Sequence, residues 1–130
     1  RLSEMRRIRD GELPVVEPAV PLPRGETCHF EGPGRLLKEK NLRTFQRDGV
    51  RYRVRGFTID KEGRLLITDR RVLLVHTGTT SVPMDRILDV EVDTDHSVVR
   101  ITKDGANTPV VLTTPDALRA GAIVAAVRGL

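Results

Sequence analysis

Apolar and polar residues alternate with a period of two along most of this chain, and this period constrains the fold most. Leu88, Val90 and Val92 alternate with acidic residues, and Tyr52 and Val54 alternate with arginines. Successive side chains of a strand point to opposite faces, so the alternation is typical of strands with one wet face. Turn signals recur about every 8–12 residues, the spacing of a sandwich or barrel. We expect about seven or eight antiparallel strands.

The turns that separate these strands are predicted from pairs and triplets of turn-forming residues. They are Pro33-Gly34, Asp48-Gly49, Glu62-Gly63, Thr68-Asp69-Arg70, Thr77-Gly78, Thr94-Asp95-His96 and Asp104-Gly105.

The first 24 residues have no period of two. Leu2, Met5 and Ile8 recur every three residues, which predicts the last turns of a helix that stops near Gly11 and begins upstream. Four prolines lie within residues 13–24, too dense for a helix or an inner strand. We therefore divide the chain into the end of a helix (1–12), a Pro-rich linker (13–24) and one globular domain (25–130).

The end of the chain predicts one amphipathic helix. Thr114 is expected to be its N-cap, Pro115 its first residue and Asp116 part of its first turn. Six apolar residues then share one face at helical spacing. They are Ala117, Ala120, Ile123, Val124, Val127 and Leu130.

Cysteine content and hydropathy bear on the compartment. The single cysteine, Cys28, has no partner for a disulfide within the chain, and no apolar run reaches the roughly 18 residues of a membrane span. These features favour a cytoplasmic protein. The sequence opens at Arg1 without a methionine or a leader, so we expect it to be part of a longer protein.

Two segments carry a family resemblance. Residues 63–74 read Gly-x-Leu-x-Ile-Thr-Asp-x-Arg, and residues 81–91 contain Val-Pro-x-x-x-Ile. Both resemble the hairpin and strand entry of bacterial pleckstrin-homology-like and GRAM-like domains, and the resemblance continues to residue 130. It implies a mainly β fold of about seven strands, in which two nearly orthogonal sheets form a sandwich or partly open barrel capped by a C-terminal helix. Residues 35–58 are longer and more basic than the family's second and third strands.

The hairpin motif is interpreted as architecture. Thr68 and Asp69 can satisfy the backbone groups of the turn with their side chains. Arg71 is expected to pair with Asp69 or with an acid on a neighbouring strand. Pro83 is expected at the start of a strand, where its missing donor is harmless.

The residues that could support catalysis do not converge. Cys28 and His29 are adjacent in a predicted strand and point to opposite faces, so the pair cannot act as nucleophile and base. Cys28 is expected to be a small buried residue. His96 lies in a turn with Asp93 and Asp95, which could hold a cation or simply be solvated. We predict no enzyme, no catalytic residue, no metal site and no cofactor.

A basic segment is the main candidate for binding. Residues 35–55 contain eight basic and two acidic side chains, a local charge of +6 that could attract phosphate or an anionic membrane surface. The candidate residues for binding an anion or partner are Lys38, Lys40, Arg43, Arg47, Arg51, Arg53 and Arg55.

Other interpretations of this segment stay open. Arg51, Arg53 and Arg55 have the spacing of Asp89, Glu91 and Asp93, with which they could pair across strands. A nucleic-acid surface would use Tyr52 and Phe57 for stacking, yet the alternation places Tyr52 towards the core. Arginine can also be the routine solvated cation of a GC-rich genome.

The family contains lipid-binding domains, protein-binding domains and bacterial assembly modules, so the fold does not choose a function. Open sheet edges and a basic N-terminal half beside an acidic C-terminal half favour self-association. We predict a non-catalytic protein-interaction or self-association module of a larger bacterial protein. The alternative is a peripheral module at the inner face of the membrane that binds anionic lipid through the basic segment, and nucleic-acid binding is weaker.

Overall fold

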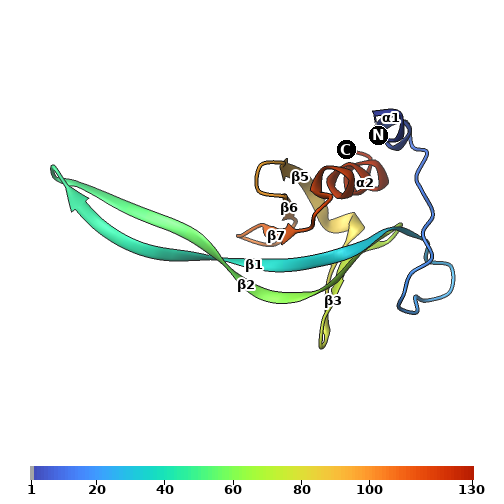
Figure 1. The fold of residues 1–130 in the computed structure, drawn as a ribbon, viewed down its shortest axis with the longest axis horizontal. Helices are drawn as coiled ribbons and strands as arrows, with labels where there is room; N and C mark the ends of the chain where they lie inside the picture. The colour runs from blue at the N-terminus through green and yellow to red at the C-terminus, as the bar shows by residue number, and fades with distance from the viewer. Residues whose placement is uncertain (1) are drawn as a thin grey trace.

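The computed structural model describes residues 2–130 and is mainly β (Figure 1). Seven antiparallel strands form one open sheet in the order β4-β3-β2-β1-β7-β6-β5. The expected number of about seven strands is confirmed, whereas the resemblance implied two sheets. The elements are α1 (Leu2–Arg9), β1 (Cys28–Arg47), β2 (Val50–Thr68), β3 (Arg71–Val75), β4 (Thr79–Pro83), the 3-10 helix η1 (Met84–Arg86), β5 (Ile87–Asp93), β6 (Val98–Lys103), β7 (Val110–Thr113) and α2 (Ala117–Arg128).

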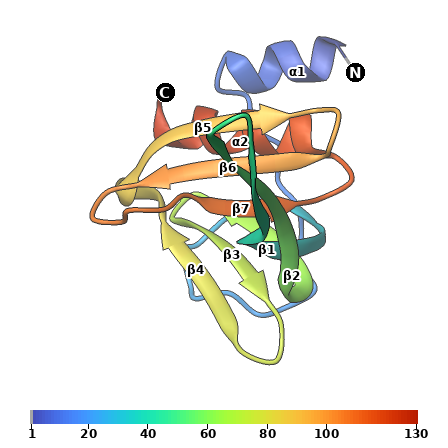
Figure 2. The same ribbon diagram turned by 90° about the vertical axis from the view of Figure 1, so that its left-hand side faces the viewer.

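The sheet bends around one core. β5, β6 and β7 run across the direction of β3 and β4, and α2 lies against β5 and β6 (Figure 2). Leu65, Ile67, Ile87, Ile101 and Ile123 are all at most 1% exposed within the main apolar cluster. Branched aliphatic side chains therefore supply the core, in keeping with a chain that has no Trp.

The closeness of α2 to the sheet depends on a glycine. A Cβ added to Gly121 would lie 2.2 Å from Cγ2 of Val92 on β5. Because real side chains do not approach this closely, only glycine allows the helix to pack at this distance.

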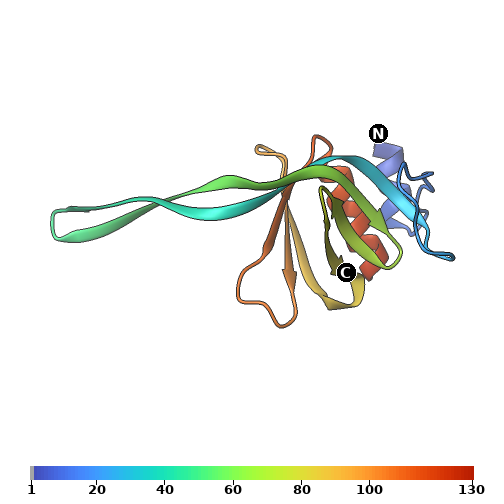
Figure 3. The same ribbon diagram turned by 90° about the horizontal axis from the view of Figure 1, so that it is seen from below.

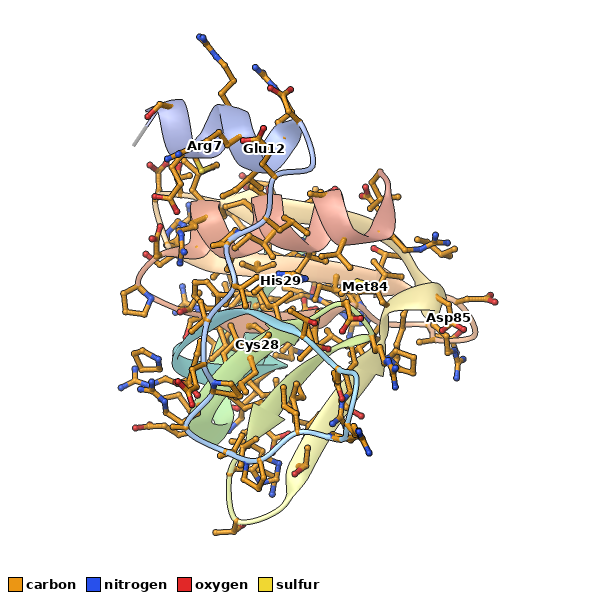
Figure 4. All side chains as sticks on the ribbon, turned by 90° about the vertical axis from the view of Figure 1, so that its right-hand side faces the viewer. Arg7, Glu12, Cys28, His29, Met84 and Asp85 are labelled. Atoms are coloured by element: carbon orange, nitrogen blue, oxygen red, sulfur yellow. The ribbon has the colours of Figure 1, made fainter. Side chains whose placement is uncertain are left out.

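The N-terminal segment packs against this core. Ile8 of α1 is 1% exposed, and Arg119 of α2 donates to Glu4. Gly11 has φ +89°, as expected for a residue that ends a helix. The predicted linker contains no helix or strand, but the Val16 amide donates to the Cys28 carbonyl (2.9 Å). Figure 4 shows the chain passing from Glu12 along Cys28 and His29.

The β1–β2 hairpin differs most from expectation. Its strands have 20 and 19 residues, and the predicted Asp48-Gly49 turn joins them, with φ +51° and +76°. Positive φ at both central residues is the geometry of a type I′ hairpin turn. The predicted turns at Pro33-Gly34 and Glu62-Gly63 are wrong, because these residues lie inside β1 and β2.

Those two glycines have a packing role. Gly34 pairs with Gly63 across the hairpin. A Cβ on Gly63 would lie 1.9 Å from the Val75 carbonyl oxygen, and one on Gly34 would lie 2.7 Å from Cβ of Leu65. Glycine inside a strand often marks a close approach of this kind, so the same residue type that suggests a turn permits packing here.

Two smaller expectations about strand and helix ends are also wrong. Thr114 is not the N-cap, because its hydroxyl donates to the Pro33 carbonyl (2.9 Å) and α2 begins at Ala117 after Asp116. Pro83 ends β4, an edge strand, and does not begin a strand.

The face predicted for α2 is confirmed along the helix, where Val127 of the last turn is partly buried against the core, and fails only at Leu130. Ala117, Ala120, Ile123 and Val124 are buried. Leu130 lies beyond the helix and is 58% exposed.

Candidate interaction arm

Residues 38–59 form a two-stranded arm that projects from the body (Figures 1 and 3). β1 pairs with β7 only at residues 35–37, and β2 pairs with β3 only at residues 64–67. Between these points and the Asp48-Gly49 turn, β1 and β2 pair only with each other. No side chain of the arm is buried.

All seven predicted binding residues lie on this arm. Four are on β1 and three are on β2, so the structure brings them into one ribbon. Opposite residues of an antiparallel pair share a face, which sorts them into two sets. Lys38, Lys40, Arg43 and Arg47 lie on one face; Arg51, Arg53 and Arg55 lie on the other.

We call the face with Arg51, Arg53 and Arg55 the arginine face and the opposite one the aromatic face. On the aromatic face, the rings of Phe45 and Tyr52 stack with centroids 5.1 Å apart and planes at 14°. The Arg43 guanidinium lies 4.9 Å from the Phe45 centroid, a cation–π contact. These contacts stiffen the ribbon near its tip.

The prediction that Tyr52 faces the core is wrong. Its side chain is 44% exposed, as is that of Phe57 on the arginine face. Tyr52 does lie opposite the arginines, but no second layer covers that side of the arm. Alternation in the sequence correctly predicted which residues share a face of the arm. It could not predict whether another layer of the protein covers that face.

The predicted pairing of the arginines with β5 is also wrong within one chain. Asp89, Glu91 and Asp93 lie on β5, which β1, β7 and β6 separate from β2. Arg55 instead pairs with Glu39 (3.1 Å). Across residues 2–130, the other six basic residues of the arm make no ion pair.

The hairpin motif forms a compact polar cluster at the β2–β3 turn. The Thr68 hydroxyl donates to Glu26 Oε2 (2.6 Å) and accepts from the amides of Arg70 and Arg71. Asp69 accepts from the Thr27 amide, which lies outside the turn, so the prediction that the side chains satisfy backbone groups of the turn is confirmed for Thr68 and not for Asp69.

The acid that pairs with Arg71 is Glu26, at 2.9 Å. Burial would raise the pKa of Glu26, but hydrogen bonds from Arg71 and Thr68 outweigh it and hold the pKa below its usual value. Sequence reasoning missed this residue, since 45 positions separate it from Arg71.

Cys28 and His29 are both held in the body. Cys28 is 2% exposed, which confirms a small buried residue, and burial raises the pKa of its thiol. The His29 ring nitrogen Nδ1 lies 2.7 Å from the Pro14 carbonyl oxygen. Figure 4 shows both residues beneath the N-terminal segment.

The acidic turn between β5 and β6 is organised by Asp93. Its carboxylate accepts from the amides of Asp95 and His96 and lies 2.8 Å from Nδ1 of His96. The hydrogen bond to His96 lowers the pKa of Asp93. Within residues 2–130, no group of three His, Cys, Asp or Glu side chains could hold a metal ion.

No helix within residues 2–130 has the length and hydropathy of a membrane span. Comparison of the chain with protein families, with curated proteins and with solved structures found no match.

Proposed function

We propose that this chain is a non-catalytic module that works by self-association, and that the arm is its contact element. The observation that carries this proposal is the exposure of apolar side chains along the arm. Leu42, Val50 and Ile59 are each more than half exposed. A two-stranded ribbon in water is marginally stable alone, and its free edges are ready to pair with another chain. A partner chain that covers the arm would bury its exposed apolar side chains and pair its free strand edges.

A pleckstrin-homology-like body is part of the proposal. The arrangement of two meanders that join through β1, with crossing strand directions and a C-terminal helix, is consistent with it. In this interpretation the arm is an elongation of the first two strands, β1 and β2, beyond the body.

The state of the reactive side chains supports a non-catalytic role. Cys28 is buried, and the three histidine rings each contact a partner: Pro14 for His29, Thr80 for His76 and Asp93 for His96. A nucleophile and a base in contact with each other would argue against this proposal.

An arm-deleted variant tests the proposal. Removing residues 38–46 together with 51–58 keeps the Asp48-Gly49 turn and joins the pairs Leu37–Ile59 and Arg47–Val50, which lie on opposite faces as neighbouring pairs of a hairpin must. Light scattering should give a mass above that of a monomer for the intact chain at high concentration, and a monomer for the folded variant. A monomeric intact chain, or a variant that associates equally well, would contradict the proposal.

Anionic lipid is the second candidate, because six basic residues of the arm lack an acidic partner within residues 2–130. Basic side chains near an anionic surface each contribute about 1 kcal/mol. Sedimentation with phosphatidylserine vesicles should then show binding that weakens with salt. Changing Arg51, Arg53 and Arg55 to Glu should abolish it, whereas changing the exposed Arg7, Arg9 and Arg24 to Glu should weaken it less. Salt-insensitive sedimentation or none would remove this candidate.

A further inference from the structure

Several strand edges are unpaired within residues 2–130, namely those of β4, of β5 and of both strands of the arm. Two of them, β5 and β2 of the arm, carry complementary side chains. β5 is the last strand of the sheet and pairs only with β6 (Figure 2). Arg128 donates to the Ile87 carbonyl, but residues 88–92 make no backbone hydrogen bond within 2–130 beyond those to β6. Along the arm, β2 likewise pairs only with β1 from Val50 to Ile59. Such edges are templates for strand addition.

The exposed part of β5 has one acidic face and one apolar face. Val90 and Val92 point to α2, because both lie within 4 Å of a Cβ built on Gly121. Asp89 and Glu91 therefore lie on the opposite face, where both are exposed. Neither makes an ion pair within residues 2–130, although Arg100 of β6 is the cross-strand neighbour of Glu91.

The arm has the complementary pair of faces on β2. Arg51 and Arg53 lie on the arginine face and have no acidic partner within the described chain. Tyr52 and Val54 lie on the aromatic face, the first exposed and the second half-buried. This part of β2 therefore matches β5 on both faces. Its basic face is complementary to the acidic face of β5, and its apolar face matches the apolar face of β5.

Directly opposite residues of paired strands share a face. Any register that sets Arg51 and Arg53 beside two of Asp89, Glu91 and Asp93 therefore sets Tyr52 beside Val90 or Val92. Opposite charges then meet on one face and apolar side chains meet on the other. A shift of the register by one residue would set arginine beside valine on both faces. Only registers that differ by two residues therefore fit.

We propose that β2 of the arm in one copy adds as a strand to the β5 edge of a second copy. The two edges cannot meet within one chain, because three strands lie between β2 and β5. β5 has seven residues, and residues 50–59 of the arm are long enough to cover it. This inference rests on the proposed self-association and names the surface that the arm contacts.

Charge exchange between the two edges tests this inference. Arg55 is left unchanged because it pairs with Glu39. Asp93 is left unchanged because its carboxylate accepts from an amide of the β5–β6 turn. R51E/R53E and D89K/E91K alone should each weaken self-association by more than about tenfold, since each sets like charges face to face. An equimolar mixture of the two variants should restore it, and so should all four substitutions in one chain. The matched control is R7E/R9E, which reverses two exposed arginines on α1.

Recovery in the mixture separates a specific contact from a folding defect, and circular dichroism checks each variant. A zero-length carbodiimide adds a direct measurement: with R51K/R53K, the new amines should cross-link to Asp89 or Glu91 of another copy. A cross-link confined to single chains would count against the contact.

Association that survives both reversals, or that the mixture does not restore, would overturn the inference and leave the proposed self-association standing. A monomeric intact chain would overturn both. If that monomer bound phosphatidylserine vesicles or duplex DNA through Arg51 and Arg53, the arm would serve an anion and not a second copy.

Discussion

The two ends of β2 show how the surroundings of a strand decide what its side chains do. Residues 65–68 are buried, whereas residues 50–55 are exposed or half-exposed, although the same strand runs through both. Near its C-terminal end, β2 has neighbours on both edges and α2 and the N-terminal segment over its faces. In the arm it has one neighbour and no second layer. Three comparisons between body and arm test this difference.

Truncation of a leucine should give the largest difference in stability between the body and the arm. Leu66 is 0% exposed and packs with Cys28 and Leu73, whereas Leu42 on the arm is 58% exposed. Leu66→Ala should lower the free energy of unfolding by about 2–5 kcal/mol, because it removes buried methyl groups and leaves a cavity. Leu42→Ala should change it by less than about 0.5 kcal/mol. Equal effects in urea titrations would show that the arm is as well packed as the body.

Glycine substitution should give the next largest difference. A Cβ on Gly63 would meet the Val75 backbone at 1.9 Å, whereas one on Gly56 of the arm would meet the Leu42 side chain at 2.7 Å. Gly63→Ala should destabilise by about 1–3 kcal/mol or more through overpacking against backbone that cannot move aside. Gly56→Ala should be nearly neutral, since an exposed leucine can change rotamer. Thermal denaturation of both variants checks this; a neutral Gly63→Ala would mean that β3 shifts easily.

Ion-pair removal should give the smallest difference of the three. Glu26 accepts from Arg71 and Thr68 and its side chain is 2% exposed, whereas both partners of the Glu39–Arg55 pair are about half exposed. Glu26→Gln should cost about 1–3 kcal/mol. Glu39→Gln should cost about 0–1 kcal/mol. Urea titration of both variants at pH 7 gives the two values.

The pH dependence gives the control for Glu26. Its pKa is lowered in the folded protein, so its contribution is complete above the ordinary carboxyl value of 4.5 and is lost as pH falls through the folded value. The intact chain should therefore lose more stability than Glu26→Gln on acidification below that value. Parallel curves for the two proteins would contradict the lowered pKa.

The part of the fold that sequence predicted best is the part where every local signal agrees. Around residues 63–75, alternation, turn chemistry and the Thr68-Asp69 motif all indicate the β2–β3 hairpin, and the structure contains it. Near Gly34 and Gly63, glycine served close packing and was mistaken for a turn, because composition alone does not separate these two uses.

The candidate site was predicted in its residues but not in its form. The seven basic residues do lie together, yet a period of two says nothing about strand length or about a covering layer. The pairing of Arg51 and Arg53 with β5 failed for a different reason: equal spacing shows that two strands can match, whereas the order of strands in the sheet decides whether they meet.

The packing of α1 beside α2 has a practical consequence. Both ends of the described chain lie at the end of the molecule away from the arm tip (Figures 1 and 3). At about 3.3 Å per residue, the arm extends roughly 35 Å in the opposite direction. A fluorescent protein or an affinity tag attached at either terminus would therefore sit clear of the arm itself. A tag at the C-terminus would nevertheless lie beside β5, because Arg128 donates to the Ile87 carbonyl, and so would probe the proposed contact by obstructing it.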